Sequence, residues 1–225
     1  MTRDDTPHRS GPGTPGASAR ARYEALRARD DARRRRVFGR LAPVVSLVVG
    51  PKRSTEAWGR GAEGEERVGP FLTHSVGDNG IVLHDRKIPR SRANLDHLAV
   101  VASGIWVIDS KHYRGRLQLR TVGGWFAPRR ALCIGRFEHS ALVRSAERQR
   151  ATVVRRVPPD VPVNAALCFT GVELGLFARP FVLDGVLVAW PKPLAKALDA
   201  PGPLDAGRRH ELAALLARAF PPYGA

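Results

Sequence analysis

Apolar positions recur at helical spacing in some stretches of the chain and at strand spacing in others. The predicted helices span 57–74, 138–157, 194–199 and 204–220. The predicted strands span 81–84, 95–102, 105–110, 117–120, 163–170 and 186–190. This order of a helix, three strands, a helix and a strand predicts an α/β fold with a mixed central sheet flanked by helices.

The first 56 residues have a different character from the rest. Residues 1–20 are rich in Gly, Pro, Ser, Thr and Arg without periodicity, which predicts a disordered leader. Residues 21–40 predict a basic helix, which is either a solvated surface or a phosphate-binding arm. This helix closes with Arg33, Arg34, Arg35 and Arg36. The expected division is a basic, partly disordered N-terminal extension (1–56), a main domain (57–195) and a C-terminal helical cap (196–225).

The charge of the chain indicates an acidic partner. Lys and Arg number 37 against 21 Asp and Glu, which gives a net charge of +16. Residues 1–60 hold 14 basic and 6 acidic residues, so half of the excess lies in about a quarter of the chain. Nucleic acid or an anionic membrane surface would match this charge.

The cysteine content and the hydropathy argue against a disulfide-rich protein and against a membrane-spanning one. Cys133 and Cys168 are too few for a disulfide scaffold and do not form a Cys-x-x-Cys pair. The longest apolar run, 41–50, contains Pro43 and is shorter than the roughly 20 residues of a membrane-spanning helix. We therefore expect a cytoplasmic protein without a transmembrane segment, and contact of residues 41–49 with a membrane surface stays open.

The stretch from Asp96 to Lys111 predicts a hairpin that gathers charged side chains. Two apolar runs flank Ser103-Gly104, and if these two residues form the turn, Asp96 lies directly opposite Lys111. Side chains alternate along strands, so Asp96, Asp109 and Lys111 share one face. Two carboxylates at the diagonal separation of about 7–8 Å can share a divalent cation. The alternative is an ordinary salt bridge between Asp96 and Lys111 at a strand end.

Two predicted helices each place one polar side chain on their inward face. Glu65 falls there in the first helix, and Gln149 falls there in the 138–157 helix. Glu65 is either a metal ligand or a side chain paired with Arg, and Gln149 is either a site residue or a satisfied core amide. The outward face of the 138–157 helix is basic, and its arginines are either solvated or in contact with nucleic acid. They are Arg144, Arg148 and Arg155.

The motifs together resemble those of a known family. They are Gly61-Ala62-Glu63-Gly64-Glu65, His84-Asp85 with Ile88-Pro89, Leu95-Asp96-His97, and Asp109-Ser110-Lys111-His112-Tyr113-Arg114-Gly115. This set resembles the nuclease-related domain (NERD) family of the PD-(D/E)xK superfamily, which implies a restriction-endonuclease-like core. The chain departs from the superfamily pattern at Leu95, where proline is often found, and Pro70 is unusual in the first helix.

The resemblance also implies site residues and an activity. Asp96, Asp109 and Lys111 match the two acidic positions and the lysine of the motif, Glu65 matches the family's Gly-Glu glutamate, and Gln149 matches a glutamine on the helix after the sheet. The implied function is a metal-dependent nuclease, with DNA favoured over RNA, in which Asp96, Asp109 and Glu65 hold Mg²⁺ or Mn²⁺. A non-catalytic nucleic-acid-binding module and a peripheral membrane role are the alternatives.

Overall fold

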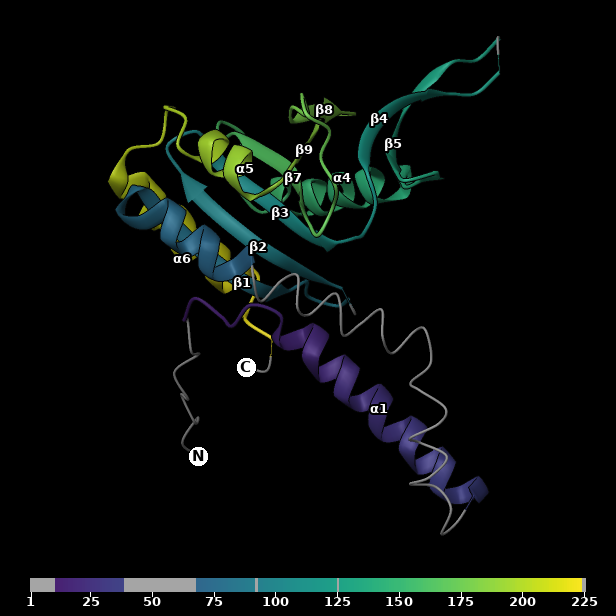
Figure 1. The fold of residues 1–225 in the computed structure, drawn as a ribbon. Coiled ribbons are helices and arrows are strands. Elements are labelled where there is room, and N and C mark those ends of the chain that lie inside the picture. The colour runs from purple at the N-terminus through teal and green to yellow at the C-terminus, as the bar shows by residue number, and fades with distance from the viewer. Residues whose placement is uncertain (1–10, 39–67, 92, 125, 224–225) are drawn as a thin grey trace, which may run out of the picture.

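The computed structural model describes residues 11–38, 68–91, 93–124 and 126–223, and these form a mixed α/β structure (Figure 1). Its helices are α1 (Ala17–Phe38), a helical segment at 68–76, the 3₁₀ turn η2 (Gly77–Asn79), α4 (Ser140–Val154), α5 (Pro191–Leu198) and α6 (Ala206–Ala219). Its strands are β1 (Gly80–Lys87), β2 (Asn94–Val101), β3 (Gly104–His112), β4 (Leu117–Val122), β5 (Arg129–Ile134), β6 (Phe137–Glu138), β7 (Val163–Thr170), β8 (Phe181–Leu183) and β9 (Val186–Ala189).

A six-stranded sheet forms the centre of the molecule, in the order β1-β2-β3-β7-β9-β8. β1, β2 and β3 are antiparallel, β7 runs parallel to β3 and β9, and β8 closes the edge antiparallel to β9. A second sheet, β4-β5-β6, projects from the body as an arm (Figure 1). The predicted mixed sheet, consistent with a restriction-endonuclease-like fold, is thereby confirmed.

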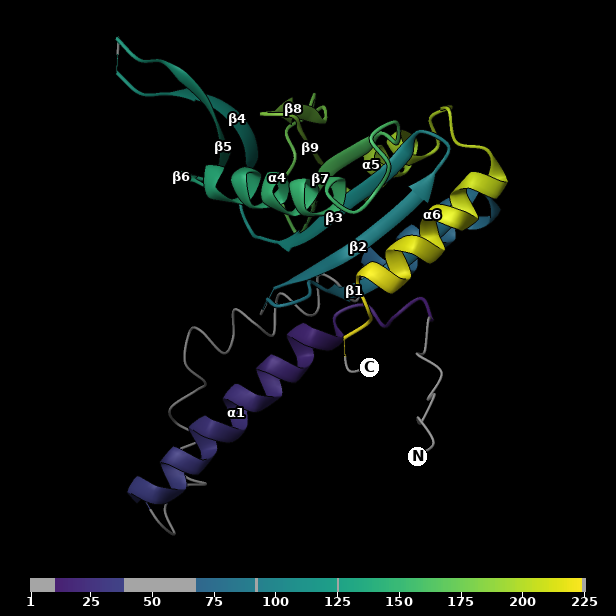
Figure 2. The ribbon, with the colours of Figure 1, turned by 180° about the vertical axis from the view of Figure 1, so that it is seen from behind.

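Helices cover both faces of the central sheet. α4 and α6 lie on one face (Figure 2), where Val100 and Val107 pack with Val153 and the apolar side of α6. The 68–76 helix and α5 lie on the other face, where Ala99 and Ile108 pack with buried side chains of both helices. β2 and β3 are therefore central strands that are apolar on both sides, as their continuous hydrophobic runs predicted.

The register predicted for the β2–β3 hairpin is wrong, because the two-residue turn lies one residue earlier in the chain than predicted. Val101 pairs with Gly104, so the turn consists of Ala102 and Ser103. Gly104 has φ +127°, and a Cβ there would lie 2.5 Å from the carbonyl oxygen of Pro162. The glycine is needed for the close approach of the chain before β7 and not for the turn, so the strands shift relative to the prediction.

Three strands were not predicted, namely β5, β6 and β8. β8 and β9 are joined by Asp184-Gly185, both at positive φ, which is a strong hairpin signal in the sequence. β5 follows Gly123, Gly124 and Pro128, which interrupt the pattern of a continuous hairpin. The arm therefore has three strands, whereas only the strand at 117–120 was predicted.

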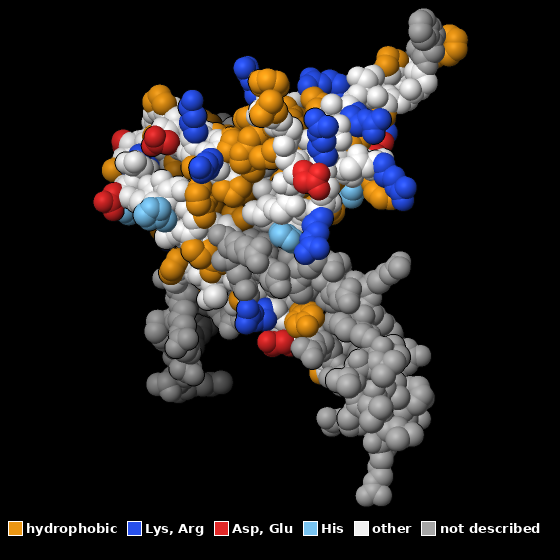
Figure 3. All heavy atoms as spheres, viewed as in Figure 1, with side chains coloured by type: hydrophobic (Ala, Val, Ile, Leu, Met, Phe, Trp, Pro, Cys, Tyr) orange, Lys and Arg blue, Asp and Glu red, His pale blue; other side chains and the backbone are white. Residues whose placement is uncertain are grey.

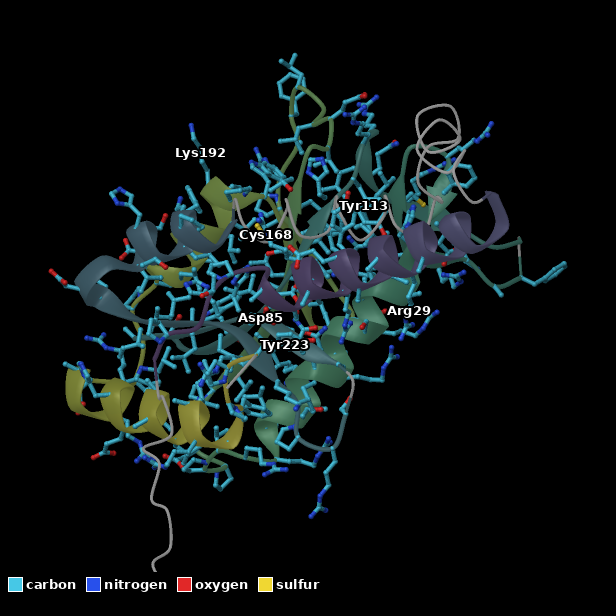
Figure 4. The ribbon with its side chains drawn as sticks, turned by 90° about the horizontal axis from the view of Figure 1, so that it is seen from below. Arg29, Asp85, Tyr113, Cys168, Lys192 and Tyr223 are labelled. Carbon is cyan, nitrogen blue, oxygen red and sulfur yellow. The ribbon has the colours of Figure 1, made fainter. Side chains whose placement is uncertain are left out.

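Part of the expected disordered leader is ordered against β1. The amide of His84 donates to Pro12 O, and the Arg86 guanidinium donates to Gly11 O. α1 begins at Ala17, earlier than predicted, and its Ser18 amide donates to the buried carboxylate of Asp85. Figure 4 shows Asp85 and Tyr223 beside this end of α1, and the Tyr223 amide donates to Asp85 O. This edge of the sheet is therefore covered by the N-terminal segment and the C-terminal residues.

Among the described helices, none has both the length and the apolar character that crossing a bilayer requires. The apolar run at 41–49 lies outside the described residues.

Candidate functional site

Asp96 and Asp109 lie on neighbouring central strands, and both are buried, with 6% and 2% of their surface exposed. The paired residues of the hairpin end at His97 and Ile108, and Asp96 and Asp109 are the next residues beyond this last pair. The observed register therefore differs from the predicted one, in which Asp96 lay opposite Lys111 and diagonal to Asp109.

Lys111 lies beside these carboxylates. Its ammonium group forms an ion pair with Asp109 and also donates to Ser110 O at 3.2 Å. The lysine side chain is 25% exposed, whereas that of Asp109 is 3% exposed. The cation is therefore at the open side of the pair, next to Asp109 and not directly opposite Asp96 as predicted.

Asp96 is tied to the same strand through the backbone. Its Oδ2 accepts a hydrogen bond of 2.9 Å from the amide of Ser110, the residue that follows Asp109. A hydrogen bond from a backbone amide to a carboxylate is charge-assisted and therefore stronger than a bond between neutral groups. It holds the carboxylate in one orientation. This bond fixes Asp96 and the Asp109-Ser110-Lys111 segment to each other across the hairpin.

α4 contributes a polar atom on the face of the sheet that carries the two aspartates. α4 packs against β3 and β7, and the Oε1 atom of Gln149 is buried without a hydrogen-bond partner among the described residues. A satisfied core amide, the alternative reading of the sequence, does not describe this oxygen. A buried polar atom that lacks a partner costs about 1–3 kcal/mol, so it favours a ligand that donates to it.

These oxygens suit a hard divalent cation. Mg²⁺ prefers carboxylate and carbonyl oxygens and keeps several waters, and the side chains of Asp96 and Asp109 offer such oxygens. Within the described ranges, no group of three or more His, Cys, Asp or Glu side chains is placed to hold a metal ion. Glu65, the third predicted metal ligand, lies outside the described residues.

The opposite face of the same strands carries a neutral hydrogen-bonded chain that the sequence did not suggest. His97 Nε2 lies 3.0 Å from Ser110 Oγ, and His97 Nδ1 lies 2.9 Å from His84 Nδ1. His84 Nε2 lies 2.9 Å from Thr73 Oγ1, which donates to Gly69 O. With both imidazoles neutral, all these hydrogen bonds can point the same way along the chain. Ser110 then donates to His97, His97 to His84, His84 to Thr73, and Thr73 to Gly69 O.

Burial keeps both imidazoles in the neutral form. Desolvation, followed by the charge of Arg86, lowers the pKa of His84 to about 4. Desolvation, followed by the charges of His84 and Lys111, lowers the pKa of His97 well below its ordinary value. His97 points away from the two aspartates, as alternation along β2 predicted. The signal for the chain was available, because His84, His97 and Ser110 alternate onto one face in the correct register.

The predicted nucleic-acid-binding residues fall into two groups. Arg144, Arg148 and Arg155 are exposed on α4 and at its carboxyl end. Arg33, Arg34, Arg35 and Arg36 lie in the last turns of α1, and their side chains are outside the described part of the chain. Asp85 of the His84-Asp85 motif has φ +46° and accepts from Ser18 and Asn94, so it anchors α1.

Comparison with known proteins identifies the domain. Residues 60–170 match the family model of the nuclease-related domain, NERD, a range that includes all five predicted site residues. No curated protein and no solved structure matches the chain. Residues 60–170 of the chain therefore form a nuclease-related domain, and the NERD family is part of the PD-(D/E)xK-like nuclease superfamily.

Proposed function

We propose that this protein is a metal-dependent nuclease that hydrolyses phosphodiester bonds in DNA. The observation that carries the proposal is the pair of buried carboxylates, Asp96 and Asp109, on neighbouring strands, with Lys111 paired to Asp109. Buried charged groups on central strands are costly unless they are paired or hold an ion. Membership of a nuclease-related family supports the same conclusion.

Asp96 and Asp109 would hold Mg²⁺ or Mn²⁺, and Glu65 is the proposed third ligand. When bound, the ion lowers the pKa of a coordinated water and neutralises charge on the phosphate. The unpartnered oxygen of Gln149 is available to accept a hydrogen bond from a water and so to orient it.

Lys111 supplies positive charge where the phosphate would enter. Asp109 and Ser110 O hold its ammonium group on the solvent side of the carboxylates. A fixed cation at that point stabilises negative charge that develops on a phosphate oxygen, because it needs little reorganisation during the reaction. The hydrogen bond from the Ser110 amide to the Asp96 carboxylate holds Asp96 next to the strand segment that carries Asp109 and Lys111.

The distribution of charge agrees with a polyanionic substrate. The net charge of the chain is +16, and Arg144, Arg148 and Arg155 are exposed along α4, which packs on the strand that carries Asp109. Basic surfaces of this kind bind phosphates and release counterions. The preference for DNA over RNA is part of the proposal.

The test is cleavage of plasmid and oligonucleotide DNA in Mg²⁺ or Mn²⁺. We expect Asp109→Asn, Asp96→Asn and Lys111→Met each to lower the rate on the order of 100-fold or more, and EDTA to abolish cleavage. Asp78→Asn, which changes an exposed aspartate in η2, is the matched control and should cleave normally. Cleavage that persists in EDTA, or at equal rates in all variants, would contradict the proposal.

A non-catalytic nucleic-acid-binding module is the second candidate, and the exposed arginines of α4 favour it. It predicts binding that weakens steeply with salt and needs no divalent ion. Arg144→Gln combined with Arg148→Gln would then remove most binding, and no condition would yield cleavage.

A further inference from the structure

A groove of about 530 Å³ opens where the chain leaves the parallel strands of the central sheet. Its lining combines residues of β4 and β8 with three connections: Arg116 from the one after β3, Leu176, Phe177 and Arg179 from the one after β7, and Trp190 after β9. Ligands of open α/β sheets bind outside the carboxyl ends of parallel strands. The groove lies at that edge, and Arg116 follows Lys111 by five positions in the chain.

Backbone bonds join two of these connections into one wall. The amide of Glu173 donates to Gly115 O, and the amide of Leu117 donates to Glu173 O. Nearer the sheet, the amide of Tyr113 donates to Thr170 O. The segment that leaves β3 after Lys111 and the segment that leaves β7 are therefore fixed side by side, which gives the groove a definite position relative to the end of β3.

The groove combines exposed apolar surface with positive charge. Leu176 and Phe177 are 92% and 88% exposed, which is unusual for large apolar side chains that lie next to each other. Arg116 and Arg179 are also among the lining residues, and none of the described lining residues is Asp or Glu. In Figure 3, hydrophobic side chains gather on the upper body of the molecule with Lys and Arg around them.

Gly175 brings the guanidinium of Arg116 into the groove. A Cβ at position 175 would lie 2.9 Å from an Arg116 terminal nitrogen, so the guanidinium crosses directly over this glycine. Gly175 precedes Phe177 by two positions, and Arg116 and Phe177 both line the groove. An aromatic ring and a guanidinium in one groove can contact a base and a phosphate of the same strand.

We propose that this groove binds a single-stranded segment of nucleic acid, with a base stacked on Phe177 and adjacent phosphates paired with Arg116 and Arg179. The proposal rests on the proposed function for its nucleic-acid occupant and adds the unpaired state of the substrate. A base inside a duplex presents only its edges, whereas a single strand can lay the face of a base on an exposed ring. The two guanidinium groups and the acid-free lining match a polyanion better than an apolar peptide.

The test measures binding of fluorescent oligothymidylate and of a duplex of equal length by anisotropy. The full chain carries Asp109→Asn and the buffer contains EDTA, so that cleavage cannot interfere. We expect Phe177→Ala to weaken oligothymidylate binding roughly 5- to 100-fold and duplex binding less than about twofold. Phe126→Ala changes a 98% exposed phenylalanine in the loop between β4 and β5 and is the matched control, with unchanged affinity.

Two further readouts locate the contact. Arg179→Gln should lower the slope of log affinity against log salt by about 0.7, the value for one phosphate of a single strand. Photocross-linking of an iodouracil-containing strand should attach it within residues 174–181. Unchanged affinity in Phe177→Ala and Arg179→Gln, equal loss in Phe126→Ala, or cross-links only outside 174–181 would overturn the proposal.

The outcomes separate this proposal from the nuclease proposal. Cleavage by the wild type together with unaltered binding in Phe177→Ala removes the groove and leaves the nuclease. Binding at Phe177 without cleavage by the wild type in Mg²⁺ or Mn²⁺ removes the nuclease and leaves the groove.

Discussion

The two faces of β2 and β3 carry opposite kinds of polar chemistry at nearly the same point along the strands. On the face of α4 and α6, Asp96, Asp109 and Lys111 bring three charged groups together. On the other face, His84, His97 and Ser110 form a neutral hydrogen-bonded chain that ends at the partly exposed Thr73. Neighbouring residues of one strand therefore enter either a charged site or a neutral one.

The difference lies in how well each face satisfies its own groups. In the neutral chain every ring nitrogen has a partner within the protein, so nothing further is needed for stability. The charged face holds two buried carboxylates and also the buried Gln149 oxygen, which has no partner among the described residues. A ligand that donates to this oxygen would therefore stabilise the charged face, whereas the neutral face already satisfies its own groups.

His97→Ala should give the largest change in stability. It removes a fully buried ring, leaves a cavity, and deprives both His84 and Ser110 of a partner, so we expect a loss of about 4 kcal/mol in the free energy of unfolding. Chemical denaturation followed by circular dichroism measures this value. Asp109→Asn, on the other face, serves as the control and should cost no more than about 1 kcal/mol. Equal losses in the two variants would remove the distinction between the faces.

Acid should weaken the protein through the neutral chain. The pKa of His84 is lowered to about 4, so the unfolded chain, with an ordinary pKa of 6.5, binds protons first as the pH falls. The contribution of His84 is complete above pH 6.5 and is lost progressively toward pH 4, up to about 3 kcal/mol. The lowered pKa of His97 acts in the same direction.

Denaturation midpoints of wild type and His84→Gln between pH 7 and pH 4 check this expectation. The wild type should lose more stability than the variant over this range, because the carboxylates common to both cancel in the difference. Parallel pH profiles would show that His84 is not held in the neutral form.

Gln149→Leu should give the smallest change, and in the opposite direction. It removes a buried oxygen that lacks a partner and keeps a side chain of similar volume, so we expect a gain of about 1 kcal/mol in the free energy of unfolding. The same variant should cleave DNA more slowly than the wild type. A loss of stability would mean that the oxygen is already satisfied in the folded protein.

Much of the fold could be predicted because the central strands are apolar on both faces. β7 has the predicted bounds, and β2 and β3 differ by one or two residues at each end. β5, β6 and β8 were missed because they are short or broken by glycine and proline, although Asp184-Gly185 did mark the β8–β9 turn. The docking of the start of α1 depends on Asp85 and Ser18, which are 67 positions apart, so no local pattern could indicate it.

The strand face of the candidate site residues could be predicted from the sequence, but the register of the hairpin that carries them could not. Alternation along the strands places Asp96, Asp109 and Lys111 on one face in both the predicted and the observed register. The pairing differs by two residues, and a shift of two residues leaves each side chain on the same face of the sheet. The register of the β2–β3 hairpin was not predictable, because the role of Gly104 depends on Pro162, which lies on a distant part of the chain. The unpartnered state of Gln149 likewise depends on tertiary packing.

The central claim is that Asp96 and Asp109 share a catalytic divalent cation. Anomalous diffraction from crystals soaked in Mn²⁺ tests it most directly. The account predicts one strong anomalous peak bonded to carboxylate oxygens of both Asp96 and Asp109, and no such peak in Asp109→Asn crystals. A well-ordered structure with no peak at the two carboxylates, or with a peak only elsewhere, would contradict it.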